Sequence, residues 1–282
     1  MNIFLLIAAI VVGTWNGNWF PSGRAEHRGT EAEEASTIAA AGKMIGEALR
    51  AMDGTGEEDV LLCLNEIRGP RVAMRLAEAT GRTNLVLAAI SGYRRRDRFD
   101  QQQDAILTTL PVVSKAWSLW RREKGVFAPR GYAMAKVAAA GRELEVYAIH
   151  LKSNYGATSE ALRRENRVKR SLAVRQLLQV AKSPYIIAGD MNADCWSKAF
   201  AEEEIFKLFD EKGCLNVLAL LPDGKRATHP NRRHGDSALD YIFLNGLSTD
   251  SPPRIFSARG VSDHDLVLVK TPGPTHLDFM VK

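Results

Sequence analysis

The chain has 282 residues, 45% of them hydrophobic and 25% charged, which is typical of a globular protein able to bury a large core. Its net charge of +5 favours a polyanionic partner such as nucleic acid or an anionic membrane surface. Its three cysteines are odd in number and widely spaced, which excludes a disulfide framework of the kind found in small secreted domains.

The N-terminal stretch MNIFLLIAAIVVG is apolar enough to resemble the core of a signal peptide, but it lacks the basic start that such peptides use. It also runs directly into TWNGNWF, which leaves little room for a cleavage segment. We therefore expect most of it to form the first strand, with a shortened export signal as the alternative, and we favour a cytoplasmic over a secreted protein. No other stretch is long and apolar enough to span a membrane.

A helix is predicted near residues 31–52. Thr30 and Glu33 have the spacing of a capping box at its start, and apolar residues recur along one face of it. The elements expected next are the buried strand DVLLCLNEI, a helix near 71–80, and strands near 84–90 and 104–113.

The segment GYAMAKVAAAGRELEVYAIHL is predicted to form two strands joined at Gly141, the pattern of a β-hairpin. A long helix follows near 158–182, with four apolar residues expected on its buried face: Leu162, Val168, Leu172 and Leu177. The remaining predicted elements are the strand that begins at Tyr185, a helix near 197–212 stopped by Gly213, and strands near 238–244, 254–258 and 265–270. We found no low-complexity linker and no repeat, so we expect a single domain, residues 1–282, of mixed helix and sheet.

Polar side chains stand at the ends of the predicted strands. In YIIAGDMN, residues two apart in an extended chain face the same side, so Asp190 and Asn192 would project together. The other strand ends carry Asn16, Glu66, His150, Asp240, Asp263 and His264. One Asp or Asn at a strand end is more often a turn former than a ligand, but independent turn preferences explain six such ends poorly. The sequence therefore predicts that these residues meet at one rim of the sheet, where ligands commonly bind.

Six short motifs carry a family resemblance; in chain order they are TWNGNWF, LNEIRG, IHLKSN, GDMNAD, LDYIF and VSDHD. Together they resemble the endonuclease/exonuclease/phosphatase superfamily, which includes deoxyribonuclease I-like nucleases, apurinic/apyrimidinic endonucleases, neutral sphingomyelinases and inositol polyphosphate 5-phosphatases. The match runs from about Trp15 to about Val269. The resemblance implies an α+β fold, a four-layer α/β/β/α sandwich of two packed mixed sheets flanked by helices. It also implies divalent-metal-dependent cleavage of a phosphoester at one edge of the sheets.

The resemblance further implies a role for each strand-end residue. By position, Glu66 matches the principal magnesium ligand, and Asn16 matches a neighbouring metal or phosphate contact. Asp190 and Asn192 match the pair beside the scissile phosphate. Asp190 would bind the metal and take part in the reaction, and Asn192 would take part in the reaction and contact the substrate. Asp263 matches a carboxylate on the metal side of the catalytic histidine.

The same resemblance implies two histidines with different tasks. His264 matches the catalytic histidine, Asp240 the carboxylate that orients it, and His150 a second histidine of the deoxyribonuclease and sphingomyelinase branches. We expect His264 to activate water and His150 to protonate the leaving oxygen or hold the phosphate, with an exchange of the two roles as the alternative. Mg²⁺, or Mn²⁺ in its place, would suit the oxygen ligands. Asn65 departs from the family's usual glutamine, and its shorter amide is expected to brace the site more weakly.

Basic residues cluster in YRRRDR, RRENRVKR and HPNRRH. Arginine-rich loops can follow a phosphate backbone, although a solvated helix face is an equal alternative for the second cluster. Arg130 and Asn154 are substrate-binding candidates, with a structural role as the alternative for Arg130. No apolar surface insertion is evident beyond Trp117 and Trp120, which belong more often to a core or rim.

The leading hypothesis is therefore a monomeric endonuclease acting on DNA, with no stable membrane association. A phosphatase or sphingomyelinase-like phospholipase of the same fold is the first alternative. A binding protein that has lost activity is the second, and the complete set of site residues argues against it.

Overall fold

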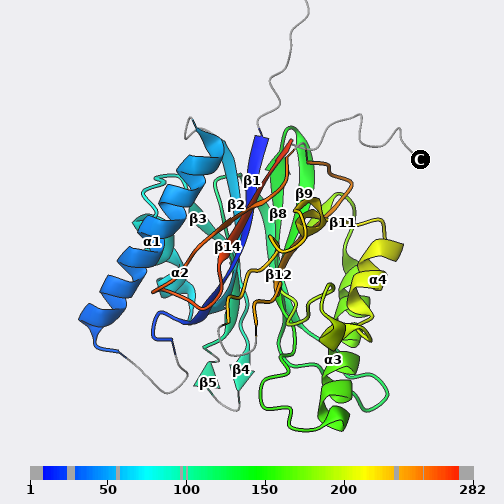
Figure 1. Ribbon diagram of the computed structural model, residues 1–282. Helices are drawn as coiled ribbons and strands as arrows, with labels where there is room; N and C mark the ends of the chain where they lie inside the picture. The colour runs from blue at the N-terminus through cyan, green and yellow to red at the C-terminus, as the bar shows by residue number, and fades with distance from the viewer. Residues whose placement is uncertain are drawn as a thin grey trace, which may run out of the picture.

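The computed structural model describes residues 9–23, 29–54, 58–95, 98–99, 101–231, 235–249 and 251–272. Two six-stranded sheets pack face to face, and helices cover both outer faces (Figure 1). This arrangement confirms the predicted four-layer α/β/β/α sandwich. Residues 1–8, on which the alternative of an export signal rests, lie outside the described residues.

The first sheet has the strand order β13-β14-β1-β2-β6-β3. Its central pair, β1 and β2, runs parallel, and the neighbouring pairs run antiparallel. The strands are β1 (Ala9–Phe20), β2 (Asp59–Ile67), β3 (Val86–Ile90), β6 (Gln103–Thr108), β13 (Arg254–Phe256) and β14 (Leu266–Pro272). Because β1 and β2 are covered on both faces, they are nearly continuous apolar runs rather than alternating ones.

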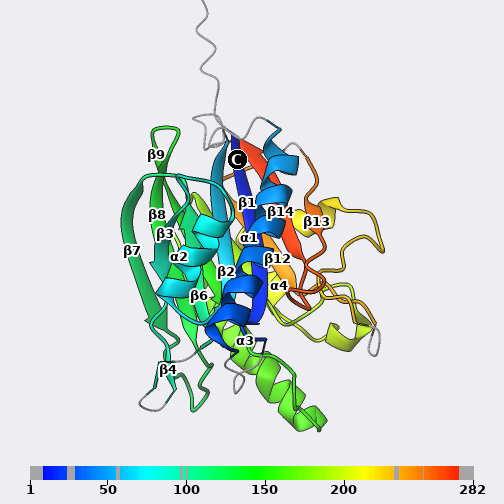
Figure 2. The same cartoon turned by 90° about the vertical axis from the view of Figure 1, so that its left-hand side faces the viewer.

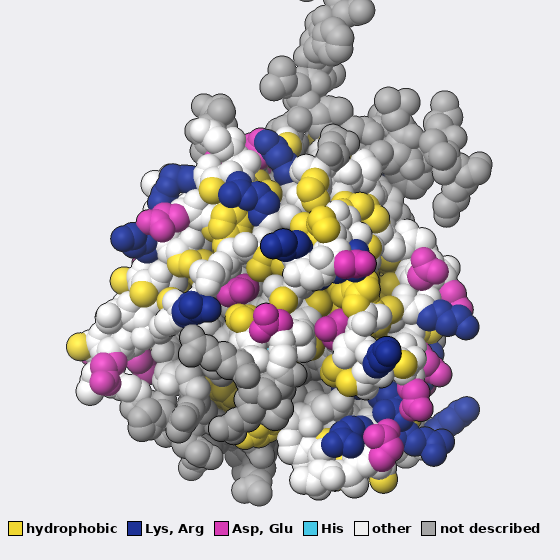
Figure 3. Space-filling view, viewed as in Figure 1, with side chains coloured by type: hydrophobic (Ala, Val, Ile, Leu, Met, Phe, Trp, Pro, Cys, Tyr) yellow, Lys and Arg dark blue, Asp and Glu magenta, His cyan; other side chains and the backbone are white. Residues whose placement is uncertain are grey.

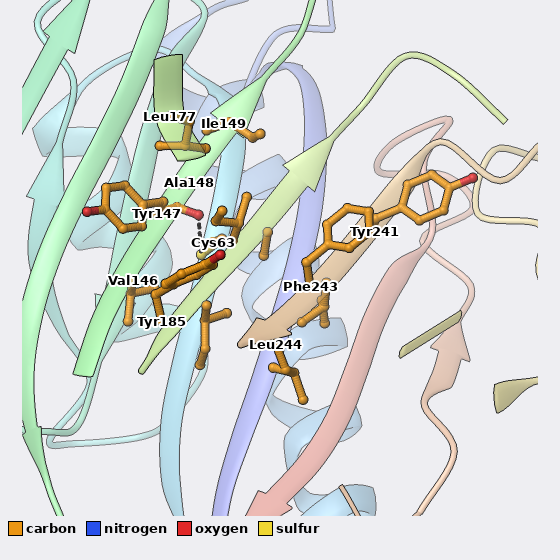
Figure 4. Close-up of a cluster of buried hydrophobic side chains, with 14 of the residues drawn as sticks. Cys63, Val146, Tyr147, Ala148, Ile149, Leu177, Tyr185, Tyr241, Phe243 and Leu244 are labelled. Carbon is orange, nitrogen blue, oxygen red and sulfur yellow. Dashed lines mark hydrogen bonds between the residues drawn. The ribbon is translucent and has the colours of Figure 1, made fainter. Parts of the chain in front are cut away.

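The second sheet has the order β11-β12-β10-β9-β8-β7, in which β9 and β10 form the parallel pair. Its strands are β7 (Val112–Leu119), β8 (Gly131–Ala139), β9 (Arg142–His150), β10 (Tyr185–Asp190), β11 (Leu215–Asn216) and β12 (Asp240–Asn245). Figure 4 shows where the two sheets meet: the Cys63 thiol of β2 lies 3.8 Å from the backbone oxygen of Tyr147 in β9. Burial raises the pKa of Cys63, as expected for a thiol that serves as a small core side chain.

Among the described residues, four helices and two short 3-10 turns complete the layers. The helices α1 (Glu31–Asp53) and α2 (Pro70–Ala79) flank the first sheet, and α3 (Glu160–Val180) and α4 (Ile205–Glu211) flank the second (Figure 1). The remaining elements are the turns η1 (Lys198–Phe200) and η2 (Val217–Leu220) and the hairpin of β4 (Arg94–Arg95) and β5 (Arg98–Phe99). The capping box predicted at Thr30 and Glu33 is present, because each side chain accepts a hydrogen bond from the other's backbone N–H.

Three predicted elements differ from the structure. The strand expected at 104–113 ends at Thr108, and after Pro111 the chain starts a separate strand, β7, that was not predicted. The helix expected at 197–212 forms only over Ile205–Glu211. On α3, Leu162 and Val168 are exposed, whereas Arg170 is fully buried. Apolar periodicity could not reveal this last difference, because the buried face of α3 is partly polar.

The direction of the strands decides where the site lies. The strands β1, β2, β9 and β10 all end at the same side of the sandwich, and β12 and β14 begin there, at the lower end in Figure 1. Polar residues at those six strand ends are therefore brought to one rim.

Candidate active site

The rim is built from both sheets. In the second sheet, Asp190 pairs in register with His150 on one side and with Asp240 on the other. In the first sheet, Asn16 pairs with Asn65, the residue before Glu66. These rim residues and His264 are all buried. Since β1 contacts β10 and β12 across the sandwich, the two sets face each other.

Asn16 joins the carboxylates of Glu66 and Asp190. Its amide nitrogen lies 2.9 Å from Asp190 Oδ2 and 3.4 Å from Glu66 Oε1. Its amide oxygen accepts a hydrogen bond of 2.9 Å from the backbone N–H of Asn18. Asn16 therefore presents N–H groups rather than oxygen to the two carboxylates. In this orientation Asn16 braces the two carboxylates, and its role as a metal or phosphate contact stays a prediction.

The backbone around Glu66 is strained. Glu66, Asn18 and Trp19 have φ values of 58°, 51° and 57°, in the left-handed region that side-chain-bearing residues seldom occupy. The backbone N–H of Trp19 donates to Glu66 Oε2 at 2.9 Å, so the irregular end of β1 holds this carboxylate. Strain of this kind persists only where the surrounding structure imposes it, as at functional sites.

His264 forms a pair with Asp240. Its Nδ1 lies 2.8 Å from Asp240 Oδ2, and the same oxygen accepts a hydrogen bond of 2.7 Å from Thr228. Burial alone would lower the pKa of His264, but the negative charges of Asp240, Asp190 and Asp263 outweigh burial and raise it to about 10. The pair therefore holds a protonated imidazole whose Nε2 faces the rim.

Two residues that were not predicted hold the loop that carries His264. The indole N–H of Trp15 donates to the backbone oxygen of His264 at 3.1 Å. The Ser262 hydroxyl donates to the backbone oxygen of Asn16 at 2.7 Å and accepts from the backbone N–H of His264 at 3.1 Å. Trp15 belongs to the motif TWN and Ser262 to the motif VSDH, and only the fold shows that these two motifs are in contact.

His150 has the opposite charge state. Its Nε2 lies 3.6 Å from Asp190 Oδ2 and 3.7 Å from Glu66 Oε1, and its Nδ1 has no hydrogen-bond partner among the described residues. Burial, followed by the positive charge of Arg130, holds the pKa of His150 well below its ordinary value. A neutral imidazole between two carboxylates can accept a proton but has none to spare at neutral pH.

Asn65 ties the rim together. Its amide nitrogen donates to Asp104 Oδ1 at 2.7 Å and to the backbone oxygen of Ile149 at 3.0 Å, and its oxygen accepts from the backbone N–H of Asp190 at 3.0 Å. The shorter amide thus reaches three groups on three strands. Burial raises the pKa of Asp104 to about 7, and Tyr93 donates to its second oxygen at 2.9 Å.

The three predicted substrate contacts differ in their surroundings. Arg130 donates to the backbone oxygens of His150 and Leu151 and to the side chain of Gln102, so its guanidinium supports the end of β9. The amide oxygen of Asn154 accepts hydrogen bonds from side chains of α3, and its role as a substrate ligand stays a prediction. Asn192 remains at the rim.

Asn192 is half-buried beside Asp190. Its backbone N–H donates to Asp190 Oδ1 at 2.8 Å, and its amide nitrogen donates to the backbone oxygen of Leu151 at 3.2 Å. Its φ of 50° is again in the left-handed region. The rim thus keeps this carboxamide next to the carboxylate with which it was predicted to act.

Asp263 lies on the outer side of His264. Its Oδ1 is 4.0 Å from His264 Nε2, and its Oδ2 is 3.7 Å from Nε2 of His229. His229 comes from the loop before β12, and its ring centroid is 4.7 Å from that of His264. Sequence reasoning did not single out His229, because it lies in an irregular segment, ATHPN, that carries no periodicity.

The rim residues fit a divalent cation. Glu66, Asp190 and Asp240 are buried, and within the described parts of the chain none of them pairs with a lysine or arginine. The ionisable side chains nearest to them are imidazoles, and in the described part of the chain Asp240 Oδ1 has no hydrogen-bond partner. Burying such charge without compensation is costly. Oxygen ligands of this kind suit hard cations.

The structure describes the second of the three arginine clusters but little of the other two. Within the second cluster, Arg163 and Arg167 pair with Glu160, and Arg170 is buried against Glu203. Basic and acidic side chains are accordingly mixed over the lower part of α3 (Figure 3). Of the other two clusters, Arg96, Arg232 and Arg233 and the side chains of Arg95 and Arg98 lie outside the described residues. Among the helices that the structure describes, none is long and apolar enough to cross a membrane.

A sandwich of two sheets with an Asp–His pair and a group of buried carboxylates at one end is typical of hydrolases that cleave phosphoesters. The chain belongs to the Endonuclease/Exonuclease/phosphatase family, whose model matches residues 13–264. Members of this family are phosphoester hydrolases that generally use a divalent metal. No curated protein sequence matches the chain.

Solved structures share the fold at low sequence identity. An endonuclease/exonuclease/phosphatase from Beutenbergia cavernae DSM 12333 has a TM-score of 0.64 and 16% identity, covering 94% of this chain and 72% of that one. A humanized D. rerio TDP2 with 14 mutations has a TM-score of 0.60 and 17% identity, covering 93% and 98%. Sphingomyelinase C from Streptomyces griseocarneus has a TM-score of 0.60 and 15% identity, covering 93% and 99%. These likenesses concern the fold.

Proposed function

We propose that this protein is a magnesium-dependent phosphodiesterase that hydrolyses nucleic acid, most directly a DNA endonuclease. The observation that carries the proposal is the set of buried carboxylates beside the His264–Asp240 pair, none of which pairs with a lysine or arginine within the described residues. Glu66 and Asp190 would hold the cation. When bound, it would offset the charge on the scissile phosphate and, by compensating the carboxylates, lower the pKa of His264.

The chain's own residues would then carry out the proton transfers. His264 would accept a proton from the attacking water at Nε2, while Asp240 keeps Nδ1 protonated and stabilises the imidazolium that forms. Asn192 would hold a phosphate oxygen through its amide. His150 is kept neutral by burial, so it would act as a hydrogen-bonding partner of the phosphate rather than as the initial acid. Of the two tasks expected of His150, this assignment favours holding the phosphate over protonating the leaving oxygen.

Positive charge near the rim supports a polyanionic substrate. Arg130 lies directly behind His150, and Lys152 follows it on the same loop. Burial, and then the nearby positive charges of Arg130, Lys169 and Arg170, lower the pKa of Lys152. Together with the net charge of +5, this grouping favours a substrate with several phosphates.

Nicking of supercoiled plasmid tests the proposal. We expect nicking with Mg²⁺ or Mn²⁺, loss of nicking with a chelator, and a rate about 100- to 10,000-fold lower for His264→Ala, the range for loss of a general base. Lys207→Ala, an exposed change on α4, is the control. An unaltered rate in His264→Ala, with the fold intact by circular dichroism, would refute the role of His264.

A second candidate, a sphingomyelinase-like phospholipase, is favoured by one observation. The edge strand β7 exposes Val113, Trp117 and Leu119, each between 45% and 50%, at the side of the sandwich (Figure 2). Such an apolar strip suits contact with a lipid surface, and the fold is shared with sphingomyelinase C from Streptomyces griseocarneus. Turnover of sphingomyelin vesicles but not of plasmid, reduced by Trp117→Ser, would replace the nuclease proposal.

A further inference from the structure

A second cluster of possible metal ligands lies beside the carboxylates. His229, Asp263 and His264 each offer one ligand atom, and these atoms lie within 4.8 Å of one another. His229 takes no part in the proposed hydrolysis. Its position is fixed by the backbone bridge between His229 and Ser237.

The spacing of the three ligand atoms is close to that of a metal site. Nε2 of His229 is 3.7 Å from Asp263 Oδ2, and Nε2 of His264 is 4.0 Å from Asp263 Oδ1. Zinc bonds of about 2.0–2.1 Å in tetrahedral geometry set ligand atoms roughly 3.3–3.5 Å apart. Small rotations of the side chains would close the difference. The Asp263 side chain is 51% exposed, so it is free to move and the site is open to ions from solvent.

The donor atoms of this cluster differ from those around Glu66. Two imidazole nitrogens and one carboxylate oxygen suit zinc and related transition metals, whereas carboxylates alone suit magnesium. His264 is already oriented for such a role, because Asp240 binds its Nδ1 and leaves Nε2 available. A carboxylate on the other ring nitrogen is the usual support of a histidine that binds zinc.

We propose that His229, Asp263 and His264 form a binding site for a transition metal of the zinc class, and that metal bound there inhibits the enzyme. The metal would occupy Nε2 of His264, the atom that has to accept the proton from water. Binding of the metal does not depend on the proposed function; the inhibition rests on it. The alternative to a metal site is that the His229 imidazole only forms an ion pair with the Asp263 carboxylate.

Direct binding measurements separate these possibilities. We would titrate Zn²⁺ into the protein by calorimetry in excess Mg²⁺, which occupies the oxygen ligands around Glu66. We expect one zinc site in the wild type and an affinity lower by at least about tenfold in His229→Gln and Asp263→Asn, since loss of even an outer partner of a zinc ligand costs that much. Glutamine keeps a hydrogen bond to Asp263 but lacks the imidazole nitrogen.

Two controls identify the ligands. Cys195→Ser should leave zinc affinity unaltered, because Cys195 is the exposed thiol of the described chain and its sulfur would be the competing soft ligand. Co²⁺ in place of Zn²⁺ should give visible absorption of a tetrahedral site in the wild type, which His229→Gln should lose. A thermal melt of each variant confirms folding. Equal zinc affinity in the wild type and both ligand variants would overturn the site.

Hydrolysis assays test the inhibition. With excess Mg²⁺, the zinc concentration that halves the rate on plasmid or bis(p-nitrophenyl) phosphate should rise in His229→Gln by the same factor as the zinc dissociation constant. Zinc that binds through His229 yet leaves hydrolysis unaltered, or equal inhibition of His229→Gln, would refute the inhibitory role. Zinc binding without cleavage of any phosphodiester would refute the proposed function and leave the metal site standing.

Discussion

His264 and His150 lie against the same carboxylate, Asp190, yet their charges are set in opposite directions. His264 has a hydrogen-bonded aspartate behind it, so nearby negative charge raises its pKa to about 10 despite burial. His150 is buried with Arg130 behind it, and its Nδ1 has no partner among the residues that the structure describes, so its pKa is held low. Sequence spacing predicted both histidines but not their charge states, which depend on the residues packed behind each ring.

The charge of His264 is testable without substrate. In the metal-free protein we expect its ring proton signals to show an imidazolium through pH 8, since the nearby carboxylates raise the pKa of His264 to about 10. Asp240→Asn removes one of the three negative charges that raise the pKa of His264, and the one hydrogen-bonded to its ring, so His264 should titrate at a lower pH. NMR titration of the histidine Cε1–H signals measures both, with His264→Gln used for assignment. Identical titration in the wild type and Asp240→Asn would contradict this account.

Asn65 shows how one buried amide can hold the rim. Replacing it with alanine leaves the backbone N–H of Asp190, the backbone oxygen of Ile149 and Asp104 Oδ1 each without this partner. At about 1–3 kcal/mol for each unsatisfied buried group, partly relieved by water, we expect Asn65→Ala to lower the free energy of unfolding by about 2–4 kcal/mol. Urea denaturation measures it. Asn245→Ala, which removes one exposed hydrogen bond, should cost less than about 1 kcal/mol.

At the scale of elements, β10 depends on a glycine for its approach to β9. Gly189 has φ of +149°, and a Cβ atom built there would lie 1.9 Å from the backbone oxygen of Ile149. The neighbouring residue, Asp190, is thereby brought level with His150. The sequence motif IAGDMN contained this glycine, but its reason, a close strand-to-strand contact, is a property of the folded sheet.

We therefore expect Gly189→Ala to lower the free energy of unfolding by about 3 kcal/mol or more, because backbone would have to move to accept the methyl group. Gly54→Ala is the matched control. Gly54 also has a positive φ, 64°, but open space around it, so its cost should be near 1 kcal/mol. Thermal or urea unfolding gives both values, and equal costs would show that the contact with Ile149 is not the cause.

A buried arginine of helix α3 holds the loop that follows His150. Arg170 is fully buried, donates to Glu203 Oε2 at 2.6 Å and to the backbone oxygen of Lys152 at 2.7 Å, and so joins the loops that follow β9 and β10. The run RRENRVKR was predicted as either a substrate surface or a solvated face. At Arg170 the run is neither of these, because Arg170 is buried in an ion pair with Glu203. A pattern of apolar residues cannot indicate such a pair.

Arg170→Met should lower the free energy of unfolding by about 3–5 kcal/mol, because it leaves Glu203 as an uncompensated buried charge. The double variant Arg170→Met/Glu203→Leu should recover part of that loss, which a double-mutant cycle measures. Arg175→Met on the same helix is the control, since its pair with Glu204, at 3.7 Å, is half-exposed and worth at most about 1 kcal/mol. A double variant less stable than Arg170→Met would contradict this explanation.

At the scale of the whole molecule, the rim exists only when the two sheets pack. Asn16 and Glu66 come from the first sheet, whereas His150, Asp190 and Asp240 come from the second. Strand ends and motif order predicted this convergence. Strand ends and motif order could not predict the exposed edge strand β7, which follows a proline and has no alternating apolar pattern. They could not predict His229 beside His264 either, because His229 lies in an irregular loop.

Packing the sheets also buries the carboxylates of Glu66 and Asp190, which among the described residues pair with no lysine or arginine, so their burial opposes folding in the absence of a cation. Magnesium should therefore raise the melting temperature: at 100 times its dissociation constant the gain is about 2.7 kcal/mol. In Glu66→Gln the metal-free protein should be at least as stable as the wild type, and the magnesium-dependent rise should largely disappear. Differential scanning fluorimetry with and without chelator measures this, and Glu47→Gln, an exposed change on α1, should respond to magnesium as the wild type does. A full magnesium response in Glu66→Gln would mean that the cation binds elsewhere.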